Sequence, residues 1–502
     1  MSETRHAIVG DSDKSSQTQG LFSAGTPGSD EQDLEHLGYA QQLMRGFGGF
    51  SNFALSFSVI SILTGAITLF DYGLSMGGPR EMLLGWPLVT LGTLMVVLSM
   101  AELCSALPTS GGMYHWAAEL GGPDWAWFTA WLNIVGLITA IAGIDYGCAE
   151  FLVPMLGWRS TPAVVLAVYA ALLLSQTLIN HYSTLLVATL SDISVVVHIA
   201  GVILLVGALL FFAPKQPLTF LRSSQNRSPI AAPYTWLFML GLLQAQWTYT
   251  GFDASAHIAE ETVDPRRHAP WGMVISVVVS SIFGYLLVLS LSLAIPDLSK
   301  VLQYNDSSGN KLPAVLTIVQ SALGARAARG VLALTVLAMW FCGLGSITSV
   351  SRSFFALARD GGMPLASIWS KVHARFKTPV PAIWLSAGLA FIAMVYSGTY
   401  SVVTSISVIG FYLAYAAPVF LGWRKKNIWL RKRGPWHLGK ASNAVNLVAL
   451  LWTTFICTMM VMPPNRRAGW GIASVIAVLY ALHIASGKHK LYKPQWGTGS
   501  GR

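Results

Sequence analysis

The stretch QAQWTYTGFDASAHIAEE, residues 244–261, contains the pattern that decides the fold. An apolar run leads into it, and Gly251 and Asp253 interrupt that run before it ends in the acidic pair Glu260-Glu261. An aspartate at the depth of a membrane is costly unless it faces a cavity or a partner. Glycine lets the backbone leave helical geometry, and an aspartate can cap the helix that restarts after it. The stretch therefore predicts a membrane-spanning helix that is interrupted near its middle.

The composition of the whole chain agrees with a membrane environment. Of the 502 residues, 53% are hydrophobic and 11% are charged, whereas soluble domains carry about 25% charged residues. Such a chain cannot cover its surface with polar groups, so much of that surface faces lipid. The formal net charge of +10 fits basic cytoplasmic loops better than a nucleic-acid-binding surface, and we expect no nucleic acid partner.

We expect an all-α polytopic membrane protein with about twelve transmembrane helices. Each helix needs about 20 apolar residues to cross the hydrocarbon core and satisfies its backbone hydrogen bonds internally. The candidate spans are 50–75, 84–107, 125–155, 161–180, 182–213, 233–258, 270–296, 328–357, 379–397, 400–422, 443–462 and 469–486. Only Asn180-His181-Tyr182 separates the fourth span from the fifth, so eleven spans remain an alternative.

Lysine and arginine residues predict how the chain sits in the membrane. If both termini are cytoplasmic, that side holds 21 of the 32 basic residues and the outer side holds 11. The positive-inside rule then predicts cytoplasmic termini for a multi-pass protein of the cell membrane. We divide the chain into a largely disordered, cytoplasmic N-terminal tail (1–45), a core of spans one to ten (46–422), a basic loop with two peripheral spans (423–486) and a cytoplasmic C-terminal tail (487–502).

Motifs that would indicate other chemistry are incomplete or missing in the sequence. The string His257-x-x-Glu260-Glu261 lacks the second histidine of a zinc-binding helix, so we expect no metal site. No GxxxxGK[ST] loop is present, so the sequence offers no phosphate-binding loop for ATP-driven pumping. The four cysteines lie in apolar stretches without CxxC spacing. We therefore expect no cofactor and no catalytic residues.

Span one carries a weaker sign of interruption. Its run SFSVISILTGAITLF, residues 56–70, holds Ser61, Thr64 and Gly65 among apolar residues. Serine and threonine also bond back to the carbonyls of an intact helix, so an ordinary span is an alternative interpretation.

Four segments together resemble the amino acid–polyamine–organocation superfamily, and within it the amino acid/choline transporter branch. They are GFSNFALSFSVISILTG (49–65), SMAELCSALPTSGGMYHWAAELGGP (99–123), WTYTGFDASAHIAEET (247–262) and SRSFFALARDGGMP (351–364). The resemblance implies a LeuT-like architecture, in which spans 1–5 and 6–10 form two inverted repeats and spans one and six are interrupted. It also implies a substrate site between those two spans.

The resemblance further implies which positions face the substrate. The backbone of span one would receive a carboxylate or another polar head, at Ser61, Ile62, Leu63, Thr64, Gly65 and Ala66. The span-six stretch would face an amine, at Thr250, Gly251, Phe252 and Asp253. Spans three and eight would complete the cavity with Asp145, Tyr146 and Ser346.

Coupling and gating residues follow from the same resemblance. Span five contains Asp192 and His198, and His198 falls near the position at which some family members carry a protonatable group. A histidine is a suitable proton carrier, whereas a neutral histidine bonded to a carbonyl is the structural alternative. We expect H⁺ as the driving ion, with Na⁺ held by hydroxyls such as Ser346 and Ser349 left open.

Charges at the cytoplasmic ends of the spans are candidates for an inner gate. Glu102 and Arg352 end spans two and eight, where they would form an ion pair that breaks on opening. Glu260 and Glu261 lie beside Arg266 and Arg267 in the sequence and would form a similar cluster. The alternative is that span-end charges simply reach the membrane interface.

We conclude from the sequence that the chain is not an enzyme but a secondary active transporter of a small amine-bearing solute, such as an amino acid, γ-aminobutyrate or choline. Its expected partners are that solute and membrane lipid. A nutrient sensor with a transporter fold and a channel are the alternatives, because the same motifs can serve all three. The oligomeric state does not follow from the sequence.

Overall fold

The computed structural model describes residues 29–303, 313–397, 400–425, 433–463 and 465–486. Residues 1–28 of the predicted N-terminal tail and the whole predicted C-terminal tail, 487–502, lie outside these ranges. The described residues are helices and connections, and their one β-type pairing is an isolated bridge between Phe47 and Thr262. The prediction of an all-α polytopic membrane protein is confirmed.

Ten helical segments of the described residues are long and apolar enough to cross a membrane, and they coincide with ten of the predicted spans. They are α2 with α3 (Gly49–Ile60 and Ile62–Thr68), α4 (Phe70–Ala106), α6 (Pro123–Met155), α7 (Pro162–Tyr182), α8 (Thr184–Phe212), α12 (Pro265–Leu293), α15 (Ala325–Arg359), α18 (Tyr400–Arg424), α20 (Ser442–Val461) and α21 (Arg466–Ser486).

Two predicted spans are not among the ten. The span at 233–258 is divided into the short helices α9 (Tyr234–Gly241), α10 (Leu243–Thr248) and α11 (Ala254–His257). The span at 379–397 is the shorter apolar helix α17 (Val380–Ser397). The exact twelve-span topology and its inverted repeats therefore stay a prediction.

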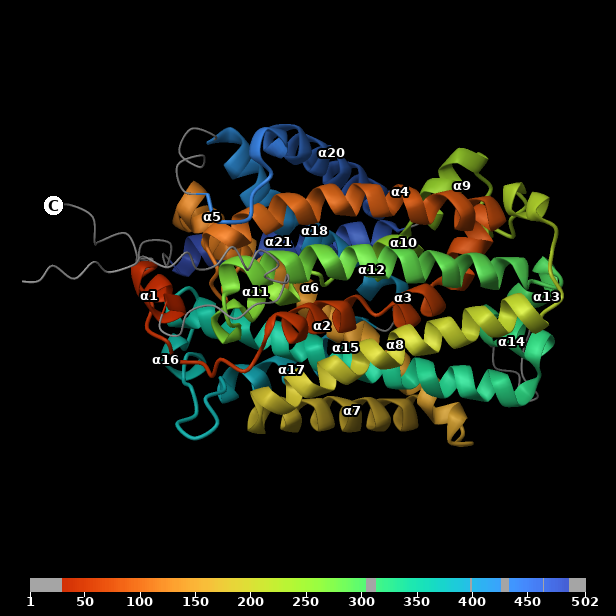
Figure 1. The fold of residues 1–502 in the computed structure, drawn as a ribbon, viewed down its shortest axis with the longest axis horizontal. Coiled ribbons are helices and arrows are strands. Elements are labelled where there is room, and N and C mark those ends of the chain that lie inside the picture. The colour runs from red at the N-terminus through yellow and green to blue at the C-terminus, as the bar shows by residue number, and fades with distance from the viewer. Residues whose placement is uncertain (1–28, 304–312, 398–399, 426–432, 464, 487–502) are drawn as a thin grey trace, which may run out of the picture.

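Short helices cover the two ends of the bundle (Figure 1). At one end lie α1 (Ser29–His36), α5 (Met113–Gly121) and α16 (Ala366–Trp369), and at the other lie α13 (Leu298–Gln303) and α14 (Ala314–Leu323). Three 3-10 turns occur in the connections, at Leu218–Arg222, Ala259–Glu261 and Gly439–Ala441. The long helices run between the two ends, as membrane-crossing helices must.

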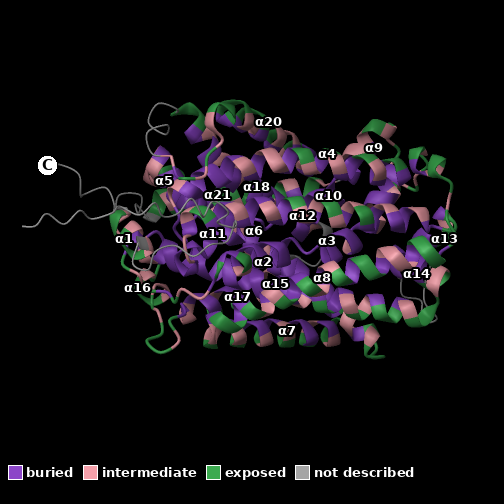
Figure 2. Ribbon diagram, viewed as in Figure 1, coloured by how far each residue is buried: buried purple, intermediate pink, exposed green. Residues whose placement is uncertain are grey.

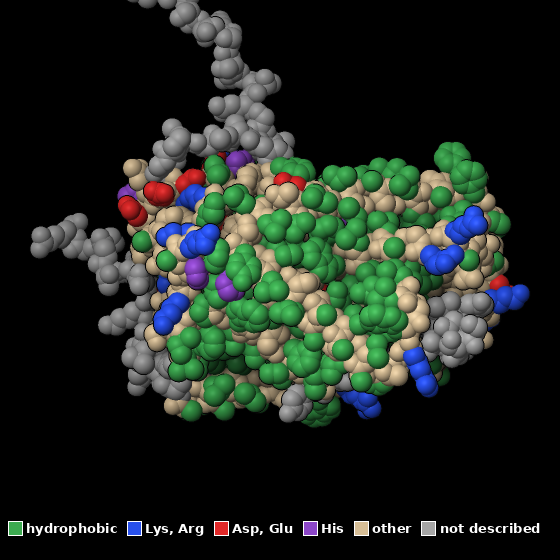
Figure 3. Space-filling view, turned by 90° about the horizontal axis from the view of Figure 1, so that it is seen from below, with side chains coloured by type: hydrophobic (Ala, Val, Ile, Leu, Met, Phe, Trp, Pro, Cys, Tyr) green, Lys and Arg blue, Asp and Glu red, His purple; other side chains and the backbone are tan. Residues whose placement is uncertain are grey.

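Burial separates central from peripheral helices (Figure 2). Within an apolar window of 18 residues in each span, 89% of the residues are buried inside the protein in the span formed by α2 and α3, against 17% in α21. The flank of the bundle is covered largely by hydrophobic side chains, whereas Lys and Arg lie toward its ends (Figure 3). This distribution is the one that a lipid-facing surface requires.

The first predicted loop is wrong in its boundaries. The sequence places a connection between spans 50–75 and 84–107, but α3 ends at Thr68 and α4 begins at Phe70. The chain instead bends at Gly78, whose φ is +67°. A Cβ at Gly78 would lie 2.0 Å from the carbonyl oxygen of Gln225, so the kink makes room for the 213–233 connection.

Spans one and six are both interrupted, as predicted. Ser61, with φ +41°, separates α2 from α3, and residues 249–253, with Gly251 at φ +91°, separate α10 from α11. The two interruptions pack directly against each other. A Cβ at Gly251 would lie 2.3 Å from Val59 Cγ1, and a Cβ at Gly65 would lie 2.4 Å from Thr248 Oγ1.

We predict that Gly251→Ala lowers the stability of the protein. The left-handed backbone costs a residue with a Cβ about 1–2 kcal/mol, and overpacking against Val59 costs about 1–3 kcal/mol more. Thermal unfolding of the purified protein in detergent measures the effect. Gly330→Ala in α15 is the matched control, because its Cβ would meet open space and alanine is the better helix former. An equal melting temperature for Gly251→Ala and wild type would contradict the packing described here.

Candidate substrate site

The interruption of span one is held by a chain of side-chain hydrogen bonds that ends at His198. The Ser61 hydroxyl lies 2.5 Å from Thr64 Oγ1 and 2.8 Å from His198 Nε2. His198 Nδ1 lies 2.8 Å from the Ser194 carbonyl oxygen, one turn earlier in α8. Because a carbonyl can only accept, Nδ1 carries the proton, and a neutral ring then leaves Nε2 to accept from Ser61. The structure thus places His198 at the break itself, bonded to a carbonyl as the structural alternative requires.

The interruption of span six is surrounded by a second buried network centred on Asp253. Its Oδ1 accepts a hydrogen bond from the Tyr415 hydroxyl of α18 at 2.7 Å. Its Oδ2 lies 3.1 Å from His257 Nε2 and accepts from Asn133 Nδ2 of α6 at 3.3 Å. His257 Nδ1 in turn lies 3.0 Å from Ser353 Oγ of α15. In this conformation protein groups surround the carboxylate, so a substrate amine would have to replace them.

The prediction that Asp253 caps the restarted helix is wrong. Its side chain makes no capping hydrogen bond, because Tyr415 and His257 draw it away from the helix start. Ser56 of α2 serves instead. Its Oγ accepts a hydrogen bond from the Ser255 N–H at 2.8 Å and donates to the Phe252 carbonyl at 2.7 Å. The inner half of span one therefore satisfies backbone groups of span six.

Asn52 strengthens this contact one turn before Ser56. Its Nδ2 donates to the Ser255 carbonyl at 3.1 Å and to Thr262 Oγ1 at 2.9 Å. Neither Asn52 nor Ser56 is among the predicted site residues. Their i, i+4 spacing in an apolar helix is the signal that would have found them, since it places both on one face.

Gln246 is a further site residue that the sequence did not single out. It lies on α10, three residues before Tyr249, and its side chain is fully buried. Neither its amide oxygen nor its amide nitrogen has a hydrogen-bond partner within the described structure. Because an unpaired buried amide is costly, this group is well suited to receive polar atoms of a bound solute.

The predicted cavity residues of spans three and eight do not join the two networks. Asp145 on α6 accepts a hydrogen bond from Gln176 of α7 at 2.8 Å. Tyr146 packs edge-on against Tyr169, with their ring centroids 6.0 Å apart. Ser346 and Ser349 donate to carbonyls of their own helix at 2.8 and 3.0 Å.

The predicted coupling residue Asp192 lies on α8 and accepts a hydrogen bond from Ser51, near the start of α2, at 3.0 Å. Asp192 therefore links span five to the N-terminal part of span one, and not to the break at Ser61. Ser51 lies ten residues before Ser61, or almost three helical turns.

The predicted pairing of inner charges is wrong. Arg352 forms a bidentate ion pair with Glu261 at 2.7 and 2.9 Å, and all of these atoms are buried. Glu102 instead contacts Arg433, in the connection before α20, at 3.4 Å and accepts from Ser442, the first residue of α20, at 2.5 Å. Sequence position shows which charges lie at the same end of the bundle, but it does not show which helix faces point at each other.

A second bidentate pair lies beside the first. Glu260 accepts from Arg359 at 2.8 Å through both oxygens, rather than pairing with Arg266 or Arg267. Those two arginines contact Asp33 and Asp264 near the surface. The C-terminal end of span six is therefore attached to α15 by two adjacent ion pairs.

Part of the predicted N-terminal tail covers these ion pairs. Phe47 and Thr262 form the isolated bridge, Gln41 Nε2 donates to the Glu260 carbonyl at 2.9 Å, and the Arg359 guanidinium stacks on the Tyr39 ring at 4.0 Å. Residues 39–47 thus pack on the C-terminal end of span six and restrain it.

Outside the spans, charge pairing governs ionisation. Burial alone would raise the pKa of Glu260, but the charge and hydrogen bonds of Arg359, with the Ser110 N–H, bring this pKa below its ordinary value of 4.5. Burial likewise opposes ionisation of Asp360, and its contact with His115 and the charge of Arg359 lower its pKa overall. Both groups therefore stabilise the protein as anions.

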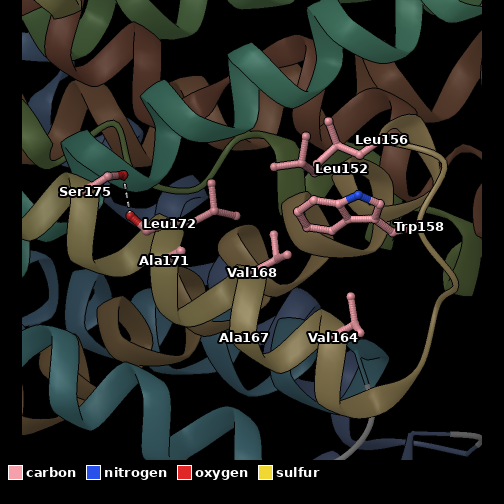
Figure 4. Close-up of a pocket in the computed structure, with 9 residues that line it drawn as sticks. All are labelled: Leu152, Leu156, Trp158, Val164, Ala167, Val168, Ala171, Leu172 and Ser175. Carbon is pink, nitrogen blue, oxygen red and sulfur yellow. Dashed lines mark hydrogen bonds between the residues drawn. The ribbon is translucent and has the colours of Figure 1, made fainter.

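The cavity drawn in Figure 4 is not part of this arrangement. It has a volume of about 650 Å³ and is lined by apolar residues of α6, α7 and their connection, with Ser175 as the polar exception. Leu156 and Trp158, in the connection between α6 and α7, are exposed. None of the residues that line the cavity belongs to either helix interruption.

Comparison with known proteins agrees with this geometry. A sequence profile of the amino acid permeases matches residues 47–483, which include both interruptions and all but the last residues of the final span. The chain belongs to the amino acid permease family. Membership of that family indicates that this permease is a transport protein.

Individual relatives cover nearly the whole permease. It is 35% identical to Amino-acid permease BAT1 of Arabidopsis thaliana, over 93% of this chain and 95% of the relative. It is also 35% identical to the BAT1 homolog of Oryza sativa, over 86% and 87% of the two chains. A putative polyamine transporter of Candida albicans is 25% identical over 88% of this chain and 82% of its own.

We predict that Arg352→Gln strongly destabilises the permease. The substitution leaves Glu261 buried without its partner, which costs about 3–5 kcal/mol. Thermal unfolding in detergent measures this loss, and the double variant Arg352→Gln with Glu261→Gln should recover part of it. Arg267→Gln is the control, because the Arg267 side chain is 61% exposed in its pair with Asp264, and exposed ion pairs are worth about 0–1 kcal/mol. Equal stability of Arg352→Gln and Arg267→Gln would contradict the buried pair.

We predict that Glu260 makes the permease sensitive to acid. The pKa of Glu260 in the folded protein lies below the ordinary value of 4.5. Its contribution to the free energy of unfolding is therefore complete above pH 4.5 and is lost as the pH falls through the folded pKa. Glu260→Gln should therefore lower the melting temperature at pH 7 and reduce the further loss between pH 5 and pH 3. Melting curves at several pH values decide this, and an unchanged acid slope in the variant would exclude the assignment.

Proposed function

We propose that this permease is a secondary active transporter that moves a small amine-bearing solute across the cell membrane by alternating access. The observation that carries the proposal is the direct packing of two helix interruptions, where Gly251 meets Val59 and Gly65 meets Thr248. Interrupted membrane helices expose backbone groups near the bilayer midplane, where transporters bind their substrates. Ser61 and residues 249–253 supply such groups side by side.

An amino acid is the substrate that the arrangement suits best. Its carboxylate would meet the span-one backbone at Ser61–Ala66, and its amine would lie near Thr250–Asp253, with Gln246 adding an amide that the protein leaves unpaired. The printed names of the relatives, amino-acid permease and polyamine transporter, support an amine-bearing solute. γ-Aminobutyrate and choline belong to the same range of candidates.

Proton coupling through His198 would change the hydrogen bonding at the break in span one. In the neutral form, Nε2 accepts the Ser61 hydroxyl proton. A protonated ring donates at both nitrogens, so Ser61 would have to accept from it and could direct its own proton to a solute carboxylate. The contact between His198 and Ser61 supports H⁺ coupling or exchange over Na⁺ dependence.

Alternating access requires that the inner end opens. The Glu261–Arg352 and Glu260–Arg359 pairs fix that end closed in this structure, so we assign them the inner gate. With cytoplasmic termini, residues 39–47 would cover the gate from the cytoplasm.

The test is transport by the purified permease in vesicles. We expect saturable uptake and counterflow of at least one amino acid from a panel that includes γ-aminobutyrate, choline and a polyamine. An inward proton gradient should stimulate uptake without Na⁺, and His198→Ala should reduce that stimulation. His36→Ala on the exposed face of α1 is the matched control and should transport like wild type.

Each other outcome has a definite meaning. Binding without uptake would identify a sensor, and flux without saturation or counterflow would identify a channel. Na⁺-stimulated uptake that persists in His198→Ala would reject the coupling. Undiminished transport by Asp253→Asn would remove Asp253 from the substrate site.

A further inference from the structure

Glu81 is a buried carboxyl group in the membrane region that the proposed mechanism does not use. It lies on α4, three residues after the kink at Gly78, and only 1% of its surface is exposed. Its Oε2 has no hydrogen-bond partner, and no described Lys, Arg or His forms an ion pair with it. An isolated buried carboxylate is far costlier than a buried neutral acid, so such a group takes up a proton.

Four glycines form a cage around this side chain. A Cβ added at Gly77 would lie 2.2 Å from Glu81 Cβ, and one at Gly85 would lie 2.2 Å from Oε1. A Cβ at Gly73 would lie 3.0 Å from Oε2, and one at Gly241, on α9, would lie 2.9 Å from Cγ. The cage therefore belongs to two helices, and it closes only while α9 lies against α4, as it does in Figure 1.

The cage is connected to both interrupted spans. The added Cβ at Gly73 would lie 2.8 Å from Gln244 Oε1 as well as 3.0 Å from Glu81 Oε2, so both oxygens border one small space. Gln244 lies on α10, before the break in span six, and its Nε2 donates to the Ala66 carbonyl of α3 at 3.1 Å. The outer half of span one thus contacts His198 at Ser61 and the Glu81 cage through Ala66.

The surroundings of Glu81 hold other titratable groups, including Arg80 and Arg222, but none of the described ones forms an ion pair with it. The hydroxyls of Tyr234 and Tyr285 donate to the carbonyls of Gly77 and Leu83. On the elements packed around this part of α4, the titratable side chains are Asp71, Tyr72 and Arg80 on α4 itself, Arg222 in the 3-10 turn, Tyr234 on α9, Tyr249 after α10, Tyr285 on α12, Tyr412 on α18 and Cys457 on α20.

The geometry points to Glu81 as a second proton-binding site of the permease, which is protonated while α9 packs on α4 and releases its proton when α9 moves away and water enters the cage. The proton binds to Oε2 with no other bond made or broken. Closing and opening of the outer half of span six are then linked to proton uptake and release, because the two conformations differ in their affinity for the proton. The inference rests on the proposed transport function.

The test compares Glu81→Gln, a neutral side chain of the same shape, with wild type in vesicles. One coupled proton supports about a tenfold accumulation per unit of pH gradient. We expect Glu81→Gln to keep substrate counterflow within about twofold of wild type, because exchange of substrate needs no net proton movement. We expect the same variant to lose about tenfold in the substrate accumulation driven by a pH gradient of one unit. Glu81→Asp, which restores a carboxyl group, should recover part of the accumulation.

Infrared difference spectroscopy tests protonation without any transport. The spectrum of the reconstituted permease at neutral pH should contain a protonated-carboxyl band that Glu81→Gln removes and that persists in Asp145→Asn, the variant of another buried carboxyl. Three results would each overturn the inference. The first is that Glu81→Gln accumulates substrate as wild type does, and the second is that the folded variant loses counterflow and accumulation equally. The third is that no infrared band is attributable to Glu81. If wild type transports nothing, the proposed function fails, whereas the infrared result still decides whether Glu81 carries a proton.

Discussion

The contact between the two helix interruptions is the constraint on which the rest of the structure depends. A helix that breaks inside a membrane leaves backbone groups that lipid cannot satisfy. Here the break in span six is satisfied by span one, through the Ser56 hydroxyl and the Asn52 amide, and the left-handed Gly251 fits only because no side chain separates it from Val59. The break in span six therefore depends on span one for its hydrogen bonds.

The same constraint explains why buried polar side chains gather from so many helices. His198 reaches Ser61 from α8, Tyr415 reaches Asp253 from α18, and Asn133 reaches it from α6. Each such group is costly unless it is hydrogen-bonded, so the networks hold the surrounding helices at fixed positions. Gln246 is the exception, because its amide stays unpaired between them. A solute that binds at the breaks must offer partners to this amide.

The all-helical class and ten of the predicted spans could be read from the sequence, because apolar length determines membrane crossing. The interruption at Gly251 was also predictable, since a glycine and an aspartate stand together within an apolar run. The pairing of inner charges was not, because Arg352 meets Glu261 across a helix face that sequence position does not reveal. Glu81 was missed for a different reason. It lies in a stretch assigned to a loop, whereas α4 continues through the Gly78 kink.

The site as a whole depends on the claim that the two interruptions together bind the solute. Electron cryo-microscopy of the permease with a transported amino acid bound tests this most directly. The account predicts ligand density in contact with the backbone at Ser61–Ala66 and at Thr250–Asp253, within reach of Gln246. Ligand density elsewhere, for example in the apolar cavity between α6 and α7, with both interruptions unoccupied, would contradict this prediction.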